Sequence, residues 1–215
     1  VREAGLDSGN IWFMPDKDLD GIYEGLTKVS ILETDEFDSL FISCSSLKDP
    51  LSFNGRHHTL EVVTFIDYDS FKALNTNPDE TNERYQQIKE RLSEKLMNTF
   101  KRILPAIHKN IVHLEVGTPI TNEYYINTTK GNVYGTEKGF MQTGPFSYKA
   151  KTEIENLYMC GASIMSHGVA GASYSGVKTA AEILSCREED LIQKDESQEL
   201  RIYDAEDNSQ WPDWI

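Results

Sequence analysis

Apolar residues recur with the spacing of a helix in the middle of the chain. They lie three or four positions apart and are Tyr85, Ile88, Leu92, Leu96, Phe100 and Ile103. Side chains at this spacing share one face of a helix. The stretch 77–80, Asn-Pro-Asp-Glu, offers an N-cap, a first-turn proline and a reciprocal glutamate. The pattern predicts a long amphipathic helix that ends before Pro105 and whose apolar face is core.

Runs of β-branched and aromatic residues predict strands on either side of this helix. They cover residues 10–14, 39–45 and 59–67, and a further run covers 111–116. A short helix is expected at about 18–26, and Lys48-Asp49-Pro50 and Asn54-Gly55 are typical of loops. Strands with packing helices favour an α+β or α/β fold with a mixed β-sheet.

The last third of the chain is organised around glycines. Residues 157–161 predict a buried strand, 161–168 a glycine-rich turn, and 168–184 a helix. One side of that helix is expected to carry Val169, Ala172, Gly176, Val177, Ala180 and Leu184. Its first turn has almost no side chains, so a ligand can approach the backbone closely. The loop 130–139 has three glycines, and its pattern is equally typical of a binding loop and of a series of exposed turns.

Composition and charge exclude several classes of function. The 215 residues fit one large domain or two unequal ones. A net charge of −14 disfavours binding to nucleic acid or to an acidic lipid surface. No apolar run of membrane-spanning length and no secretory leader is visible, which favours a cytoplasmic protein. Residues 186–215 are expected to form an acidic tail, because 187–215 hold ten acidic residues against three basic ones.

Cysteine and histidine spacing predicts no metal site. Cys44, Cys160 and Cys186 are far apart, and no CxxC pair occurs. His57 and His58 are adjacent, so in a strand they would point to opposite faces. Reduced and mostly buried thiols are the favoured interpretation.

Five blocks of sequence, taken together, point to a family. They are residues 9–12 with 18–20, 46–50, 117–125, 131–135, and 156–161 through to 168–172. In this order they resemble the C-terminal half of the phytoene desaturase, carotenoid isomerase and retinol saturase group of flavoproteins. The seven-residue step from Gly161 to Gly168 is most similar to the retinol saturase branch. The resemblance covers about residues 9–185.

The resemblance implies an FAD-dependent oxidoreductase that desaturates, saturates or isomerises a lipophilic polyene or isoprenoid by flavin hydride chemistry. NAD(P) is a further candidate as electron donor or acceptor. In this group the last strand and helix close the Rossmann-like FAD/NAD(P)-binding domain, and the helix N-terminus faces the flavin. Seven residues are thereby expected to bind the cofactor: Gly161, Ala162, Ser163, Gly168, Val169, Gly171 and Ala172.

Four aromatic residues are candidates for a substrate pocket in such an enzyme. They are Tyr124, Tyr125, Tyr134 and Phe140, and each is equally well interpreted as ordinary core. No general base stands out, so the catalytic residues stay unassigned. His167 can either approach the flavin or only shape the glycine turn, and the second role is favoured.

The chain departs from the family pattern in two ways. Ala162 stands where many related flavoproteins have an acidic residue. The chain also lacks the GxGxxG turn that holds the ADP half of FAD, so it resembles a fragment whose partner is the N-terminal FAD-binding part of a parent chain. The expected division is a partial substrate domain at 1–150, the closing strand and helix of the FAD domain at 151–185, and the tail at 186–215.

Two interpretations of the isolated chain remain open. It is either an inactive fragment of such an enzyme or a non-catalytic ligand-binding or interaction module. Peripheral membrane contact is also open, because a lipophilic substrate favours it and the acidic balance opposes it.

Overall fold

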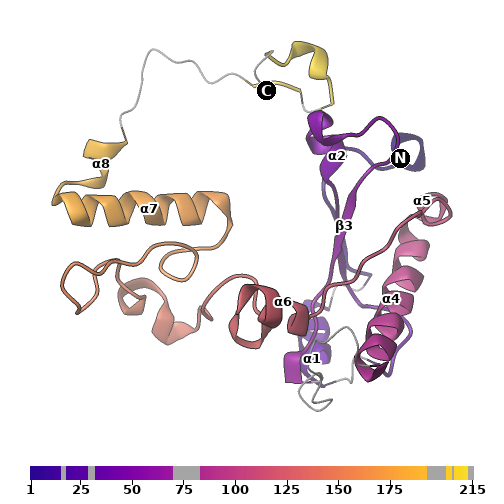
Figure 1. The fold of residues 1–215 in the computed structure, drawn as a ribbon, viewed down its shortest axis with the longest axis horizontal. Helices are drawn as coiled ribbons and strands as arrows, with labels where there is room; N and C mark the ends of the chain where they lie inside the picture. Colours follow the sequence, from indigo (N-terminus) through magenta and orange to yellow (C-terminus); the bar gives the residue numbers. More distant parts are fainter. Residues whose placement is uncertain (16–17, 29–31, 70–82, 193–201, 205, 213–215) are drawn as a thin grey trace. The chain divides into compact units, whose positions relative to one another are not determined.

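The computed structural model describes residues 1–15, 18–28, 32–69, 83–192, 202–204 and 206–212. The chain divides into two compact units, Val1–Gly131 with Ile202–Ile215, and Asn132–Arg201 (Figure 1). The predicted helix cap at 77–80 lies outside the described residues. In the described part the fold is a mixture of helices and one small antiparallel sheet, which confirms the α+β class at this coarse level.

The first unit is built on a three-stranded antiparallel sheet. Its strands are β1 (Ile11–Phe13), β2 (Leu40–Cys44) and β3 (Leu60–Val63), in the order β1-β2-β3. Ile42 pairs with Ile11 on one side and Val62 on the other, and this row faces the core. Phe41 of β2 pairs with Trp12 and Val63, and this neighbouring row lies on the outer face. The strands predicted at 10–14, 39–45 and 59–67 are confirmed, with shorter bounds.

One long helix covers the core face of this sheet. The helix α4 (Glu83–Ile103) buries Tyr85, Ile88, Leu92 and Phe100 and ends before Pro105, as predicted (Figure 1). A short helix, α5 (Pro105–His108), begins at that proline. Two polar residues share the buried face, which the apolar spacing did not predict. Thr99 Oγ1 accepts a hydrogen bond of 2.9 Å from the Phe37 N–H. The Lys95 ammonium lies 4.6 Å from the Phe37 ring centroid, and burial lowers the pKa of Lys95.

A capped helix, α6 (Pro119–Ile126), follows a coil rather than the strand predicted at 111–116. Thr118 and Thr121 form a capping box at its start. The Tyr85 hydroxyl of α4 lies 2.9 Å from Thr118 Oγ1 and 3.0 Å from Thr121 Oγ1, so the cap also fastens α6 to the core. Among its described residues this unit also contains α1 (Leu19–Lys28), α2 (Ser45–Lys48), η1 (Arg2–Ala4), η2 (Pro50–Ser52), η3 (Thr129–Gly131) and η6 (Asn208–Gln210).

The second unit contains η4 (Phe140–Gln142), η5 (Gly144–Phe146), α7 (Gly168–Leu184) and α8 (Glu188–Leu191). The predicted helix at 168–184 is confirmed. The Tyr174 hydroxyl of α7 donates to the Glu188 carboxylate of α8, and this hydrogen bond raises the pKa of Tyr174. No helix in the described ranges is long and apolar enough to cross a membrane.

The buried strand predicted at 157–161 is wrong for this structure. Tyr158 forms only an isolated bridge with Lys151, and Leu157 and Met159 are 46% and 40% exposed. Cys160 is also exposed, whereas Cys44 is buried. A β-strand needs hydrogen bonds to a neighbouring strand. Here the described pairing is limited to the segment near Ala150, whose carbonyl accepts a hydrogen bond of 2.8 Å from the Met159 N–H.

Candidate functional site

The glycine turn between residues 161 and 168 brings the chain into the first turn of α7. Gly161 and Gly168 have φ angles of 107° and 81°, in the left-handed region that favours glycine. His167 is the N-cap residue, and its side chain makes no capping hydrogen bond. Val169 is 87% exposed. Gly168, Val169 and Ala170 are all exposed, so the first turn of α7, at the positive end of the helix dipole, is open to solvent within this unit.

Close packing fixes the geometry of this turn from inside. A Cβ atom at Gly171 would lie 2.6 Å from the Ser166 carbonyl oxygen, which is backbone and cannot swing aside. A Cβ atom at Gly161 would meet nothing within 4 Å, so space remains on that side of the turn. Ala162 and Ala172 are partly buried beside these glycines.

Two buried hydroxyls of α7 hold the segment before the turn. Ser175 Oγ accepts a 2.9 Å hydrogen bond from the Gly161 N–H. The Thr179 hydroxyl is shared between the carbonyls of Met159 at 3.0 Å and Ser175 at 2.8 Å. Ser175 is fully buried and Thr179 is 8% exposed. The helix thus positions residues 159–161 through polar contacts.

The buried face of α7 differs from the side that carries the small and aliphatic residues in the sequence. Val169 and Leu184, on that side, are 87% and 63% exposed. The buried residues of α7 are Ser175, Thr179 and Ala181. The sequence does contain a pattern that predicts this face. A Ser and a Thr stand four positions apart in a run of small residues, and this spacing puts both hydroxyls on one face of the helix.

The loop at 132–138 packs on the same turn from the other side, through Ser163. Gly135 has a φ of 83°, and a Cβ atom there would lie 2.5 Å from Ser163 Oγ. The Thr136 N–H donates to Ser163 Oγ at 3.3 Å. The Thr136 hydroxyl and the Lys138 ammonium donate to the Ser163 carbonyl at 3.3 Å and 2.8 Å. The loop therefore supports the glycine turn, and it is more than a series of exposed turns.

An aromatic pair lies at the N-terminus of α7. The rings of Tyr134 and His167 are 4.7 Å apart, with an interplanar angle of 32°. Tyr134 is 57% exposed, so it is not a core residue in this structure. The structure thereby brings one predicted pocket residue together with the predicted cofactor-binding turn.

The other predicted pocket residues lie elsewhere. Tyr124 and Tyr125 belong to α6 of the first unit, are 61% and 71% exposed, and contact each other edge to face at 4.9 Å. Phe140, in the second unit, is 83% exposed. None of these three is ordinary core. Within the part of the chain that the structure describes, no cluster of three or more His, Cys, Asp or Glu residues could hold a metal ion.

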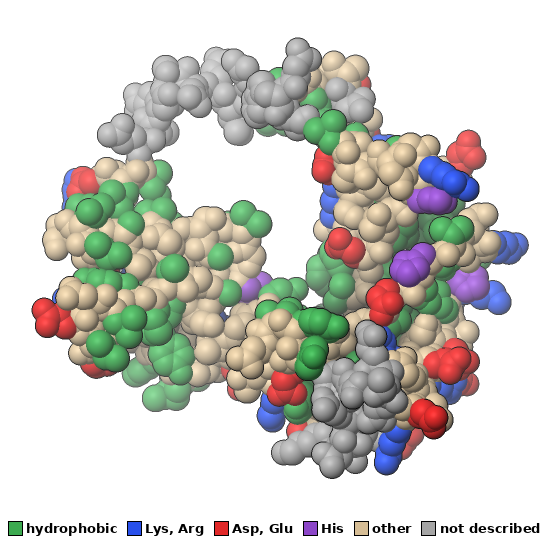
Figure 2. Space-filling model, viewed as in Figure 1, with side chains coloured by type: hydrophobic (Ala, Val, Ile, Leu, Met, Phe, Trp, Pro, Cys, Tyr) green, Lys and Arg blue, Asp and Glu red, His purple; other side chains and the backbone are tan. Residues whose placement is uncertain are grey.

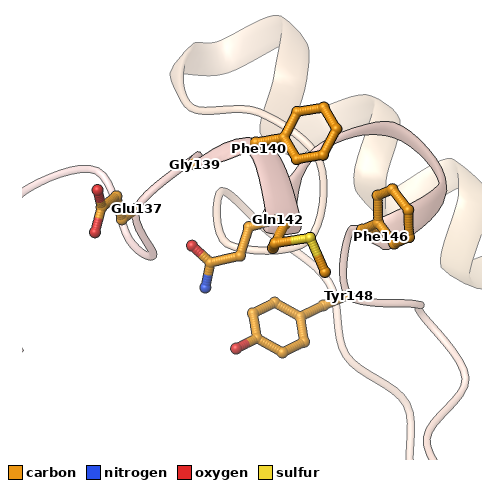
Figure 3. Close-up of a pocket in the computed structure, with 7 residues that line it drawn as sticks. Glu137, Gly139, Phe140, Gln142, Phe146 and Tyr148 are labelled. Carbon is orange, nitrogen blue, oxygen red and sulfur yellow. The ribbon is translucent and has the colours of Figure 1, made fainter.

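A pocket of about 540 Å³ lies next to Phe140 in the second unit (Figure 3). Its lining residues are Glu137, Gly139, Phe140, Met141, Gln142, Phe146 and Tyr148. Hydrophobic side chains also gather on the visible surface of this unit (Figure 2). The pocket was missed in the sequence except for Phe140, because its lining comes from two short helical turns without a periodic pattern.

Comparison with known proteins gives relatives over most of the chain. The all-trans-retinol 13,14-reductase of Danio rerio is 31% identical over 197 residues, which are 86% of this chain and 32% of the relative. The Rattus norvegicus all-trans-retinol 13,14-reductase is 26% identical over 85% of this chain and 31% of its own length. The chloroplastic prolycopene isomerase of Daucus carota is 26% identical over 68% of this chain and 23% of its own length.

The chain thus spans about a third of the length of the retinol reductases that it matches. No family model matches it, and no solved structure does. The homologues of this chain are retinol 13,14-reductases and prolycopene isomerases, which confirms its place in the retinol saturase and carotenoid isomerase branch.

Proposed function

We propose that this chain is the C-terminal part of an FAD-dependent oxidoreductase that acts on a lipophilic polyene. The observation that carries the proposal is the exposed first turn of α7, which follows a glycine turn held at Gly161 by Ser175 and at Ser163 by the loop 132–138. A planar, anion-forming group such as a flavin suits such a turn, because the helix dipole favours negative charge there.

The residues present fit this cofactor. Gly161 leaves open space where a side chain would stand, and the first turn of α7 carries only Gly168, Val169, Ala170 and Gly171. Gly168, Val169, Gly171 and Ala172 would contact the flavin ring, and Gly161, Ala162 and Ser163 would run beside the ribityl chain and the pyrophosphate. FAD supplies the hydride chemistry when bound.

The residues of this chain would then orient the cofactor, exclude water and stabilise charge. The amides of α7 would favour negative charge on the bound ring. Tyr134 and His167 would form an aromatic wall at this end of the helix, since their rings contact each other there. Catalytic residues stay unassigned, and NAD(P) as electron donor or acceptor is part of the proposal.

The fragment status is also proposed. The chain has no GxGxxG turn for the ADP half of FAD, and its relatives are about three times as long. The exposed apolar segment with Leu157 and Met159 would become a strand beside the FAD-binding part of the parent. The division into 1–150, 151–185 and 186–215, with a Rossmann-like closing strand and helix, follows from this proposal.

The substrate class comes from the relatives. Their names give all-trans-retinol and prolycopene as the molecules on which they act. We extend to this chain only the common class, a lipophilic polyene, and saturation, desaturation and isomerisation are all compatible with it. A cytoplasmic location with peripheral membrane contact fits a substrate of this class.

We expect the 215-residue chain alone to bind FAD weakly or not at all and to turn over no polyene. The physical reason is that the turn at 161–172 provides one wall of the FAD site, whereas the chain has no turn that would bind the ADP half of FAD. Titration of the purified chain with FAD, followed by flavin fluorescence, measures this. A tight yellow complex of the isolated chain would contradict the fragment proposal.

A further inference from the structure

The loop between η2 and β3 contains the single Asn-Gly pair of the sequence, Asn54 and Gly55. Both residues are exposed. Gly55 has a φ of 78°, and a Cβ atom there would meet nothing within 4 Å, so the space beside it is open. Asparagine before glycine is a reactive pair, because glycine has no side chain to keep its main-chain nitrogen away from the amide carbon of the asparagine.

Two main-chain donors hold the side chain of Asn54 through its oxygen. Oδ1 accepts from the Arg56 N–H at 2.9 Å and from the His57 N–H at 2.8 Å, as in an Asx turn. Neither Asn54 Nδ2 nor the Gly55 N–H makes a hydrogen bond to any residue in the part of the chain that the structure describes. The oxygen is therefore fixed, while both nitrogens that a ring closure would involve have no protein partner there.

These two donors suit the charge that develops during ring closure. When the Gly55 nitrogen attacks Asn54 Cγ, negative charge builds up on Oδ1. Hydrogen bonds to an oxygen become stronger as its charge grows, so donors at these distances act on Oδ1 as an oxyanion hole does. The turn places both donors in advance, whereas an unfolded chain has no such arrangement, so the fold should accelerate the closure.

We propose that Asn54 is a self-modifying site, converted to aspartate and isoaspartate through a succinimide with Gly55, and that it reacts faster in the folded protein than in an unfolded peptide. The Gly55 nitrogen loses its proton to solvent and bonds to Cγ, and the bond between Cγ and Nδ2 breaks as ammonia leaves. Water then opens the ring at either carbonyl. The net reaction consumes water and releases ammonia without oxidation or reduction, and it is independent of the proposed function.

The two products change the loop differently. Aspartate keeps an oxygen for the same two N–H donors and adds a negative charge, whereas isoaspartate carries the main chain through the side-chain methylene and lengthens it after Phe53. The Phe53 ring stacks on His58 with centroids 4.4 Å apart, and His58 Nδ1 lies 2.9 Å from Ser46 Oγ. The isoaspartyl form should therefore loosen the stacking of Phe53 on His58, and the aspartyl form should keep it.

Peptide mapping by mass spectrometry of the purified 215-residue chain, kept at mildly alkaline pH, measures the conversion of Asn54 over time. A synthetic peptide of residues 50–59 in the same buffer is the unfolded reference. The folded chain should convert about tenfold faster, less than a buried oxyanion hole would give, because these donors lie in an exposed loop. An equal or slower rate in the folded chain would overturn the proposal.

A matched pair of variants at Arg56 tests the donors directly. Arg56→Pro removes the main-chain N–H, and Arg56→Ala keeps it while removing the same charged side chain. With circular dichroism showing that both variants fold, the proline variant should react about threefold more slowly than the unmodified chain, since one of two donors is lost. The alanine variant should react at the unmodified rate. Equal rates in the two folded variants would contradict the role of the turn, and the comparison with the peptide stands without either variant.

Discussion

Gly131→Ala should lower the free energy of unfolding of the first unit by about 3 kcal/mol. Gly131 has a φ of 62°, and a Cβ atom there would lie 2.1 Å from the carbonyl oxygen and 2.5 Å from the Cα of Pro119. The left-handed conformation costs an alanine about 1 kcal/mol. Overlap with backbone at the start of α6 adds about 2 kcal/mol, because neither partner can move by rotating a side chain.

Urea denaturation followed by circular dichroism measures this loss. Gly55→Ala is the matched control, since Gly55 has a φ of 78° but a Cβ atom there would meet nothing within 4 Å. It should lose only the conformational part, about 1 kcal/mol. Equal losses in the two variants would show that the contact with Pro119 does not exist.

Gly171→Leu in the full-length protein should abolish flavin retention, and Gly171→Ala should weaken flavin affinity about 30-fold. The Cβ atom would lie 2.6 Å from the Ser166 carbonyl oxygen, so the first turn of α7 must move away from the segment before it. Overpacking of this kind costs about 2 kcal/mol. If the flavin-bound form alone carries this strain, the cost corresponds to a loss of about 30-fold in flavin affinity.

Gly176→Ala provides the control on the same helix. A Cβ atom at Gly176 would meet nothing within 4 Å, so the substitution should leave flavin content unchanged and stabilise the helix by about 1 kcal/mol. Flavin released by acid from the purified variants gives the stoichiometry. Full flavin content in Gly171→Leu would show that this turn does not bind the cofactor.

Burial patterns explain which parts of the fold the sequence predicted. The helix α4 and the strands β1 to β3 carry large apolar side chains at regular spacing, and these define their buried faces locally. The helix α7 has mostly small residues, so hydropathy does not define its face, and the hydroxyls of Ser175 and Thr179 decide it instead. The run at 111–116 has strand composition but finds no neighbouring strand in the described residues.

The candidate site was predictable to the extent that backbone geometry requires glycine. Gly161, Gly168 and Gly171 each occupy a position that a side chain would strain or crowd. The contacts of Ser163 with Thr136 and Lys138 join residues more than twenty positions apart, so no local sequence pattern predicts them.

Residues 161–172 are proposed to form one wall of a flavin site. Hydrogen exchange of the full-length protein, compared with and without its flavin, tests it most directly. Amides in 161–172 should exchange on the order of tenfold more slowly when flavin is bound, because the cofactor covers them, and the sheet β1 to β3 should change little. Unchanged exchange at 161–172, with protection elsewhere, would contradict the account.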